Sequence, residues 1–171
     1  MDFIEINSLI QQLADANAEI ESLRKQLADA KQKDINTWYL VDDDGNAKYK
    51  GQWENGLPNG TGIKFFFETS TKYSTIIEGQ FVNGFAHGYC KQSFSKSYEK
   101  TVPYYEGEFR QNCFHGKGEY HYGTGSYYKG EWSNNNMNGY GENYSHMIDQ
   151  TWVGTFCNDR KVDGEWVKGK I

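Results

Sequence analysis

Tyr105-Glu106-Gly107-Glu108-Phe109 is one copy of a short pattern: an aromatic residue or Ile, any residue, Gly, any residue, and an aromatic residue. Four more copies are Tyr49-Lys50-Gly51-Gln52-Trp53, Ile77-Glu78-Gly79-Gln80-Phe81, Tyr128-Lys129-Gly130-Glu131-Trp132 and Trp152-Val153-Gly154-Thr155-Phe156. Successive central glycines are 28, 28, 23 and 24 residues apart. A period in this range indicates a repeat array. Such arrays usually present a long binding surface and seldom supply a catalytic centre.

Each copy predicts the first strand of a β-hairpin. Tyr49, Gly51 and Trp53 alternate with polar residues, so they share one face of an extended strand. The residue five positions after each central glycine is Gly, Asn or Asp, and these residues favour tight turns. Further glycines follow nine and eleven positions after it, with Cys90 replacing the later one in unit two. Unit five departs most from this spacing and is expected to be a degenerate end repeat.

The phased pattern closely resembles the MORN repeat (membrane occupation and recognition nexus) from about Tyr49 to Trp166. The resemblance implies a mainly β fold. It would be an elongated, single-layer, twisted antiparallel sheet of about five consecutive hairpins, preceded by one long α-helix. Within an array spanning 49–171, the units would start near 49, 77, 105, 128 and 152. An aromatic-lined groove would run along the sheet, with Phe65, Tyr120 and Tyr144 of the second strands adding to its apolar face.

Residues 3–33 predict a heptad helix, followed by a connector and leading strand at 34–48. The apolar residues alternate steps of three and four, which is typical of a coiled coil. The expected oligomerisation residues are Ile6, Leu9, Leu13, Ile20, Leu23 and Leu27. Pairing with another chain, most simply as a homodimer, is favoured over docking onto the repeat domain. Parallel, antiparallel and larger assemblies all remain open.

Composition and charge exclude several classes of protein. The 171-residue chain carries a formal net charge of −5, so it lacks the basic footprint of a nucleic-acid-binding protein. The three cysteines have scattered spacing and favour reduced thiols over a disulfide framework. The N-terminus does not resemble a signal peptide. No run approaches the ~18 apolar residues of a membrane span.

No catalytic residues, metal ligands or cofactors are expected. His87, Cys90, Cys113 and His115 do not match the spacing of a Cys₄ or Cys₂His₂ zinc site. Both histidines precede the second glycine, where units one and four have Asn, so they are interpreted as turn residues. The protein is therefore not expected to be an enzyme.

The leading hypothesis is a scaffold or adaptor that self-associates and docks a helix or an extended peptide of a protein partner. The expected groove wall, and hence the partner-binding set, is Tyr49, Trp53, Phe81, Tyr105, Phe109, Tyr128, Trp132, Trp152 and Phe156. Binding to anionic phospholipid is an alternative that the acidic charge disfavours. A third alternative is an accessory subunit of a membrane- or cytoskeleton-associated complex. The expected location is the cytoplasm, in association with the cytoskeleton or a membrane.

Overall fold

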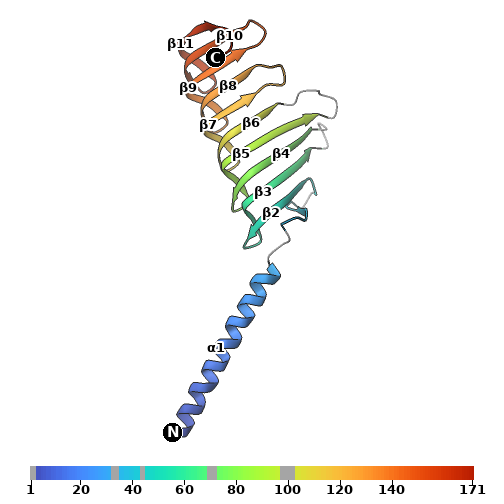
Figure 1. The fold of residues 1–171 in the computed structure, drawn as a ribbon, viewed down its shortest axis with the longest axis vertical. Helices are drawn as coiled ribbons and strands as arrows, with labels where there is room; N and C mark the ends of the chain where they lie inside the picture. The colour runs from blue at the N-terminus through green and yellow to red at the C-terminus, as the bar shows by residue number, and fades with distance from the viewer. Residues whose placement is uncertain (1–2, 32–34, 43–44, 69–72, 97–102) are drawn as a thin grey trace. The chain divides into compact units, whose positions relative to one another are not determined.

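The computed structural model describes residues 3–31, 35–42, 45–68, 73–96 and 103–171. Two compact units divide the chain, Met1–Asp34 and Ile35–Ile171, and the division falls where glycine and tyrosine first enter the sequence. The first unit holds one helix and the second holds a β-sheet (Figure 1).

Helix α1 spans Phe3–Lys31. The predicted seam residues whose side chains are described are all exposed: Ile6, Leu9, Leu13, Ile20 and Leu23 are 42–67% exposed. The side chain of Leu27 lies outside the described part of the chain. Arg24 donates to Glu21 within the helix at 2.6 Å, but both side chains are about 70% exposed, so this ion pair adds little stability.

The described strands form a single open antiparallel sheet, in which each strand pairs with its neighbours in chain order (Figure 1). The mainly β fold and its five consecutive hairpins are therefore confirmed. The hairpins are β2–β3, β4–β5, β6–β7, β8–β9 and β10–β11, and the short β1 pairs with β2. The strands are β1 Tyr39–Leu40, β2 Ala47–Glu54, β3 Leu57–Glu68, β4 Tyr73–Val82, β5 Phe85–Lys96, β6 Tyr104–Arg110, β7 Cys113–His121, β8 Tyr127–Ser133, β9 Asn136–Ser145, β10 Gln150–Cys157 and β11 Arg160–Lys168.

A row of directly paired residues crosses the sheet from β2 to β11, and nine of its ten members are glycine. In strand order the row is Gly51, Gly62, Gly79, Cys90, Gly107, Gly118, Gly130, Gly141, Gly154 and Gly164. A Cβ on Gly51 would lie 2.6 Å from the Thr61 carbonyl oxygen, and one on Gly107 would lie 2.6 Å from that of Lys117. The close approach of the paired backbones therefore requires glycine along this row.

Tyrosine rings fill the space that these glycines leave open. A Cβ on Gly62, Gly118 or Gly141 would lie 2.7 Å from a ring carbon of Tyr49, Tyr105 or Tyr128, respectively. The three hydroxyls donate to the carbonyls of Gln52, Glu108 and Glu131 at 3.1, 2.9 and 3.0 Å. Each ring thus lies on bare backbone and also bonds to the bend of its own hairpin.

Unit two reaches the same packing with a different pair of residues. Ile77 replaces the tyrosine and Cys90 replaces the third glycine, and both side chains are buried. The Cys90 thiol donates to the Gln80 carbonyl at 3.3 Å. Gln80 is the counterpart of Gln52 and Glu108, so the thiol takes over the hydrogen bond that the tyrosine hydroxyl makes elsewhere. The change from glycine to Cys90 is therefore compensated by the change from tyrosine to Ile77, and unit two keeps the packing of the repeat.

The turn of each hairpin is bonded to the second strand of the hairpin before it. Asn112 accepts from the Ala86 amide at 2.7 Å and donates its own amide to the Ala86 carbonyl at 3.0 Å. Asn135 and Phe114 repeat the pair of bonds at 2.8 and 3.1 Å, and Asp159 and Met137 do so at 2.7 and 3.0 Å.

The first junction between hairpins keeps only half of this arrangement. There, Pro58 has no amide to donate and Gly84 has no side chain to accept, but the Gly84 amide still donates to the Pro58 carbonyl at 2.8 Å. The turn residue therefore differs between units according to whether its partner strand offers an amide proton.

Moving the unit-two pair into unit four tests the proposed exchange. Gly141→Cys alone should lower the free energy of unfolding by about 1–3 kcal/mol, because the thiol overlaps the Tyr128 ring. Tyr128→Ile alone should be destabilising because it leaves a cavity. The double variant should lose at least about 1 kcal/mol less than the sum of the two, since these residues are in contact. Urea unfolding followed by tryptophan fluorescence measures each value, and strictly additive losses would contradict the exchange.

Asn135→Gly isolates the side-chain bond between hairpins, because glycine retains the φ of 68° that Asn135 adopts. Losing the acceptor for the Phe114 amide should lower the free energy of unfolding by about 1 kcal/mol. Asn134→Gly is the matched control, because Asn134 also has a positive φ, of 49°, but does not make this bond. Equal effects of the two changes in thermal or urea unfolding would refute the role of the side chain.

Candidate aromatic binding face

The face of the sheet that carries the motif aromatics is called the aromatic face, and the opposite face is called the polar face. Seven of the nine predicted partner-binding residues are buried in one cluster on the aromatic face, at 0–7% exposure. They are Tyr49, Phe81, Tyr105, Phe109, Tyr128, Trp132 and Phe156. Trp53 and Trp152 are partly buried and pack against this cluster.

Edge-to-face contacts join the rings from one hairpin to the next. Tyr49 packs against Trp53 of its own unit with ring centroids 5.2 Å apart, and against Phe81 of the next unit at 5.0 Å. Tyr105 and Tyr128 repeat this arrangement with the corresponding rings at 5.0–5.4 Å. Edge-to-face packing is a favourable geometry for aromatic rings. These rings are therefore the structural core that links the hairpins.

The burial of these seven rings leaves little of their own surface open to a partner. Each of the first four repeats bends at a register shift beside its central glycine, and the sequence pattern did not indicate this bend. A flat strand would expose such rings, whereas here they are enclosed. Contact of this set with a partner stays a prediction, and it is best placed at the partly exposed Trp53 and Trp152.

The accessible part of the aromatic face is formed mainly by residues outside the motif. Phe66, Phe94, Tyr120 and Met137 are partly buried and pack on the outside of the core cluster. A hollow of about 240 Å³ opens between units three, four and five. It is lined by Phe114, Tyr120, Tyr122, Trp132, Asn135, Met137 and Asp159. The lining is mainly aromatic, with the turn residues Asn135 and Asp159 as its polar members.

Of this lining, the sequence pattern predicts Trp132 and Tyr120 as groove residues but does not predict Phe114, Tyr122 and Met137. The alternation of strand β7 could have revealed Tyr122, because it lies four residues after Gly118 and so on the same face. The same rule corrects Phe65 and Tyr144, which lie three residues after Gly62 and Gly141. They face the polar side, where Tyr144 pairs with Tyr127.

Burial also keeps the core tyrosines in their neutral form. Desolvation raises the pKa of Tyr49 to about 12 and that of Tyr128 to about 12. The pKa of Tyr105 is raised for the same reason. The three phenols therefore remain hydrogen-bond donors throughout the physiological pH range, so their bonds to the hairpin bends do not depend on pH there.

The two histidines weighed as possible ligands, His87 and His115, lie within strands β5 and β7, at the position that Asn59 and Asn138 occupy in units one and four. The Asn59 amide donates to Asn83 and the Asn138 amide donates to Asn158, each at 3.4 Å and each to the turn of the next unit. His115 occupies the equivalent position, and its Nδ1 is buried without a hydrogen-bond partner. Within the described residues, no three His, Cys, Asp or Glu side chains are grouped so as to hold a metal ion.

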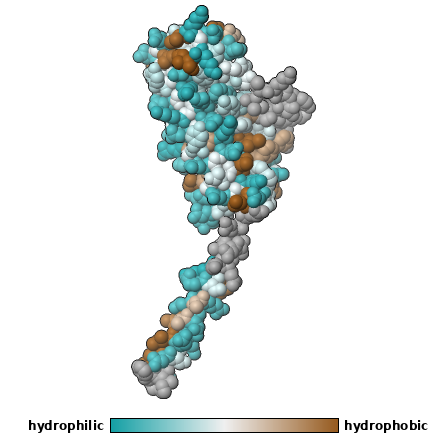
Figure 2. All heavy atoms as spheres, viewed as in Figure 1, coloured by the Kyte–Doolittle hydropathy of each residue, from teal (hydrophilic) through white to brown (hydrophobic). Residues whose placement is uncertain are grey.

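The surface in view in Figure 2 is largely hydrophilic, with hydrophobic side chains in separate patches. The helix carries a hydrophobic stretch on the side in view (Figure 2). Over the residues that the structure describes, no helix has the length and apolar character needed to cross a membrane.

Comparison with known protein families supports the hairpin array directly. The model of the MORN repeat matches residues 49–66, 78–97, 105–127 and 128–142. These segments coincide with the first four hairpins, whereas the fifth hairpin, β10–β11, follows the last matched segment. No curated protein matches the sequence. The family is generally non-enzymatic, and its repeats are often membrane-associated. From the four matches and the hairpin sheet, the chain belongs to the MORN repeat family.

Proposed function

We propose that the protein is a non-enzymatic scaffold that docks a protein partner on its aromatic face and self-associates through helix α1. The observation that carries the docking proposal is the hollow between Tyr120, Tyr122, Trp132 and Met137. Aromatic residues and Met are enriched at protein interfaces, because they bury a large apolar area. Tyr122 is 38% exposed at this hollow, so it retains surface that a partner can cover.

A helix or an extended peptide that carries an apolar anchor residue is the proposed occupant. The hollow lies on a rigid base, because its Trp132 wall is buried in the core and donates from Nε1 to the Gly118 carbonyl at 3.1 Å. A preformed wall reduces the entropy lost on binding. The turn side chains of Asn135 and Asp159 bond to strands β7 and β9, so they also hold their positions at the rim.

Self-association rests on the exposed seam of α1. Ile6, Leu9, Leu13, Ile20 and Leu23 recur at heptad spacing, and each exposes 42% or more of its surface. An isolated helix rarely leaves such a stripe in water, whereas a second copy of the helix covers it. Two copies would present two aromatic faces, which raises the avidity for a partner with two binding segments. We further propose that the scaffold acts at the cytoskeleton or at a membrane.

The seam can be broken without touching the sheet. Leu13→Asp combined with Leu23→Asp should convert a full-length dimer into a monomer, because buried carboxylates would oppose helix pairing. The control is Gln12→Asp with Ser22→Asp, which adds the same charge at neighbouring positions off the seam. Sedimentation velocity reads the mass. A wild-type monomer at all accessible concentrations, or dimers for both double variants, would exclude pairing through this seam.

Tyr122→Arg removes the exposed aromatic ring at the hollow and puts a longer, charged side chain in its place, so it should reduce partner capture by about tenfold or more. Thr155→Arg is the control, because it adds the same charge at an exposed position on the polar face. Quantitative pull-down from cell extract, with circular dichroism to verify the fold, compares the two variants. If Tyr122→Arg captures every wild-type partner at undiminished yield, the hollow is not the docking site.

A further inference from the structure

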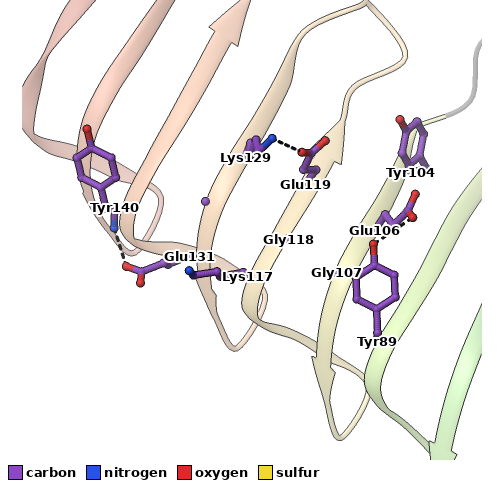
Figure 3. A pocket seen from close by; sticks show the side chains of 11 residues that line it. Tyr89, Tyr104, Glu106, Gly107, Lys117, Gly118, Glu119, Lys129, Glu131 and Tyr140 are labelled. Carbon is purple, nitrogen blue, oxygen red and sulfur yellow. Dashed lines mark hydrogen bonds and ion pairs between the residues drawn. The ribbon is translucent and has the colours of Figure 1, made fainter. Parts of the chain in front are cut away.

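A second hollow, larger than the first, lies on the polar face and belongs to no surface discussed so far. It has a volume of about 600 Å³ and crosses strands β5 to β9. Figure 3 shows its side chains projecting from neighbouring strands around a floor that includes Gly107 and Gly118. The lining is Tyr89, Tyr104, Glu106, Gly107, Lys117, Gly118, Glu119, Lys129, Gly130, Glu131 and Tyr140. This hollow is called the polar furrow.

The glycine row explains why a furrow exists there. On the polar face, a line of side chains runs along each side of the row, so bare backbone lies between the two lines. The first line across β5–β9 is Lys91, Glu106, Glu119, Lys129 and Glu142. The second line is Tyr89, Glu108, Lys117, Glu131 and Tyr140. The register shifts beside the central glycines bend the hairpins between these lines.

Acidic groups outnumber basic ones along the two lines. The lines hold five carboxylates and three ammonium groups. Lys129 pairs with Glu119 at 2.8 Å and Lys91 pairs with Glu106 at 3.4 Å. The hydrogen bond from Lys129 lowers the pKa of Glu119, so this carboxylate stays charged. Among the residues that line the furrow, the three carboxylates of Glu106, Glu119 and Glu131 outnumber the two ammonium groups of Lys117 and Lys129, so the furrow favours a cationic ligand.

Two exposed tyrosines mark the ends of the furrow. Tyr89 on β5 is 59% exposed and Tyr140 on β9 is 61% exposed, and neither packs into the core. Figure 3 places them on opposite sides of the glycine floor. The Tyr89 hydroxyl donates to Glu106 at 3.1 Å, which fixes that ring beside a carboxylate. An exposed aromatic ring next to a carboxylate is a favourable site for a guanidinium, which stacks on the ring and bonds to the acid.

We propose that the polar furrow binds an extended, arginine-containing segment of a protein partner. Arginine side chains stack on Tyr89 and Tyr140 and bond to the neighbouring carboxylates, while the peptide backbone crosses the glycine floor. Five strands span roughly 19 Å at about 4.8 Å per spacing, which an extended segment of about six residues covers. Arginine fits better than lysine because its planar guanidinium both stacks and forms two hydrogen bonds.

This surface is independent of the docking site on the aromatic face. The two hollows lie on opposite faces and share no lining residue. A partner seated at Tyr122 therefore leaves Tyr89 and Tyr140 accessible. The scaffold would then hold two different segments at once, one apolar and one basic.

Fluorescence anisotropy with the full-length protein tests the proposal. The probe is a fluorescein-labelled heptapeptide, Arg-Gly-Ser-Arg-Ser-Gly-Arg, and the comparison peptide has Glu in place of each Arg. We expect the arginine peptide to bind and the glutamate peptide not to bind. Tyr89→Ser with Tyr140→Ser should weaken binding at least about fivefold, as expected for two exposed cation–π contacts. Tyr122→Ser, on the aromatic face, should leave the affinity unchanged.

A matched pair of charge variants separates the furrow from general attraction to an acidic protein. Glu106→Gln and Glu165→Gln change the net charge equally, but Glu165 lies on β11, outside the furrow. We expect weaker binding for Glu106→Gln only. Absence of arginine-peptide binding, preference for the glutamate peptide, or equal affinity across all these variants would each overturn the proposal. None of these outcomes depends on whether the aromatic face docks a partner.

Discussion

The absence of a Cβ along the glycine row is the constraint on which the rest of this sheet depends. A single-layer sheet has no second layer to cover its apolar face, so it must build a core from its own side chains. Here the missing side chains of Gly62, Gly118 and Gly141 make room for tyrosine rings directly on the backbone. Each ring then contacts an aromatic residue of its own hairpin and one of the next. The core and the link between hairpins are thus the same set of contacts.

The bend that encloses these rings is held from the polar face. Gln52 accepts from the Thr61 amide at 2.7 Å, and Glu108 and Glu131 accept from the corresponding amides of Lys117 and Tyr140 at 3.0 and 2.8 Å. A Cβ on the glycine before each amide would meet that same Gln or Glu side chain. The glycine nine positions after the central one is therefore needed for a different reason than the glycines of the row. It leaves space for the polar side chain that fixes the hairpin bend.

The repeat, the hairpins and the strand order could be predicted from the sequence, because the alternation of residues and the turn residues are local properties. It could not reveal the burial of Tyr49 or Trp132, since burial depends on the bend between strands, and a flat strand with the same alternation would expose both. The Cys90 substitution shows a related limit. By itself, a cysteine in place of a glycine looks like a departure from the repeat. The structure shows that Ile77, which is smaller than the usual tyrosine, leaves the space that the Cys90 thiol fills. Phe65 and Tyr144 were misplaced for a simpler reason, because counting from the row glycine assigns them to the polar face.

Since the motif aromatics form the core, the two proposed binding surfaces use mainly other positions. On the aromatic face these include Phe94, Tyr120 and Tyr122, and on the polar face they include Tyr89 and Tyr140. Neither set is constrained by the packing of ring on glycine, so each unit can carry a different residue there. Tyr89 and Tyr140 stand where unit three has Lys117, with the same backbone beneath them. The aromatic residues and glycines of the motif therefore join the hairpins, whereas the proposed binding surfaces depend mainly on residues that differ between the units.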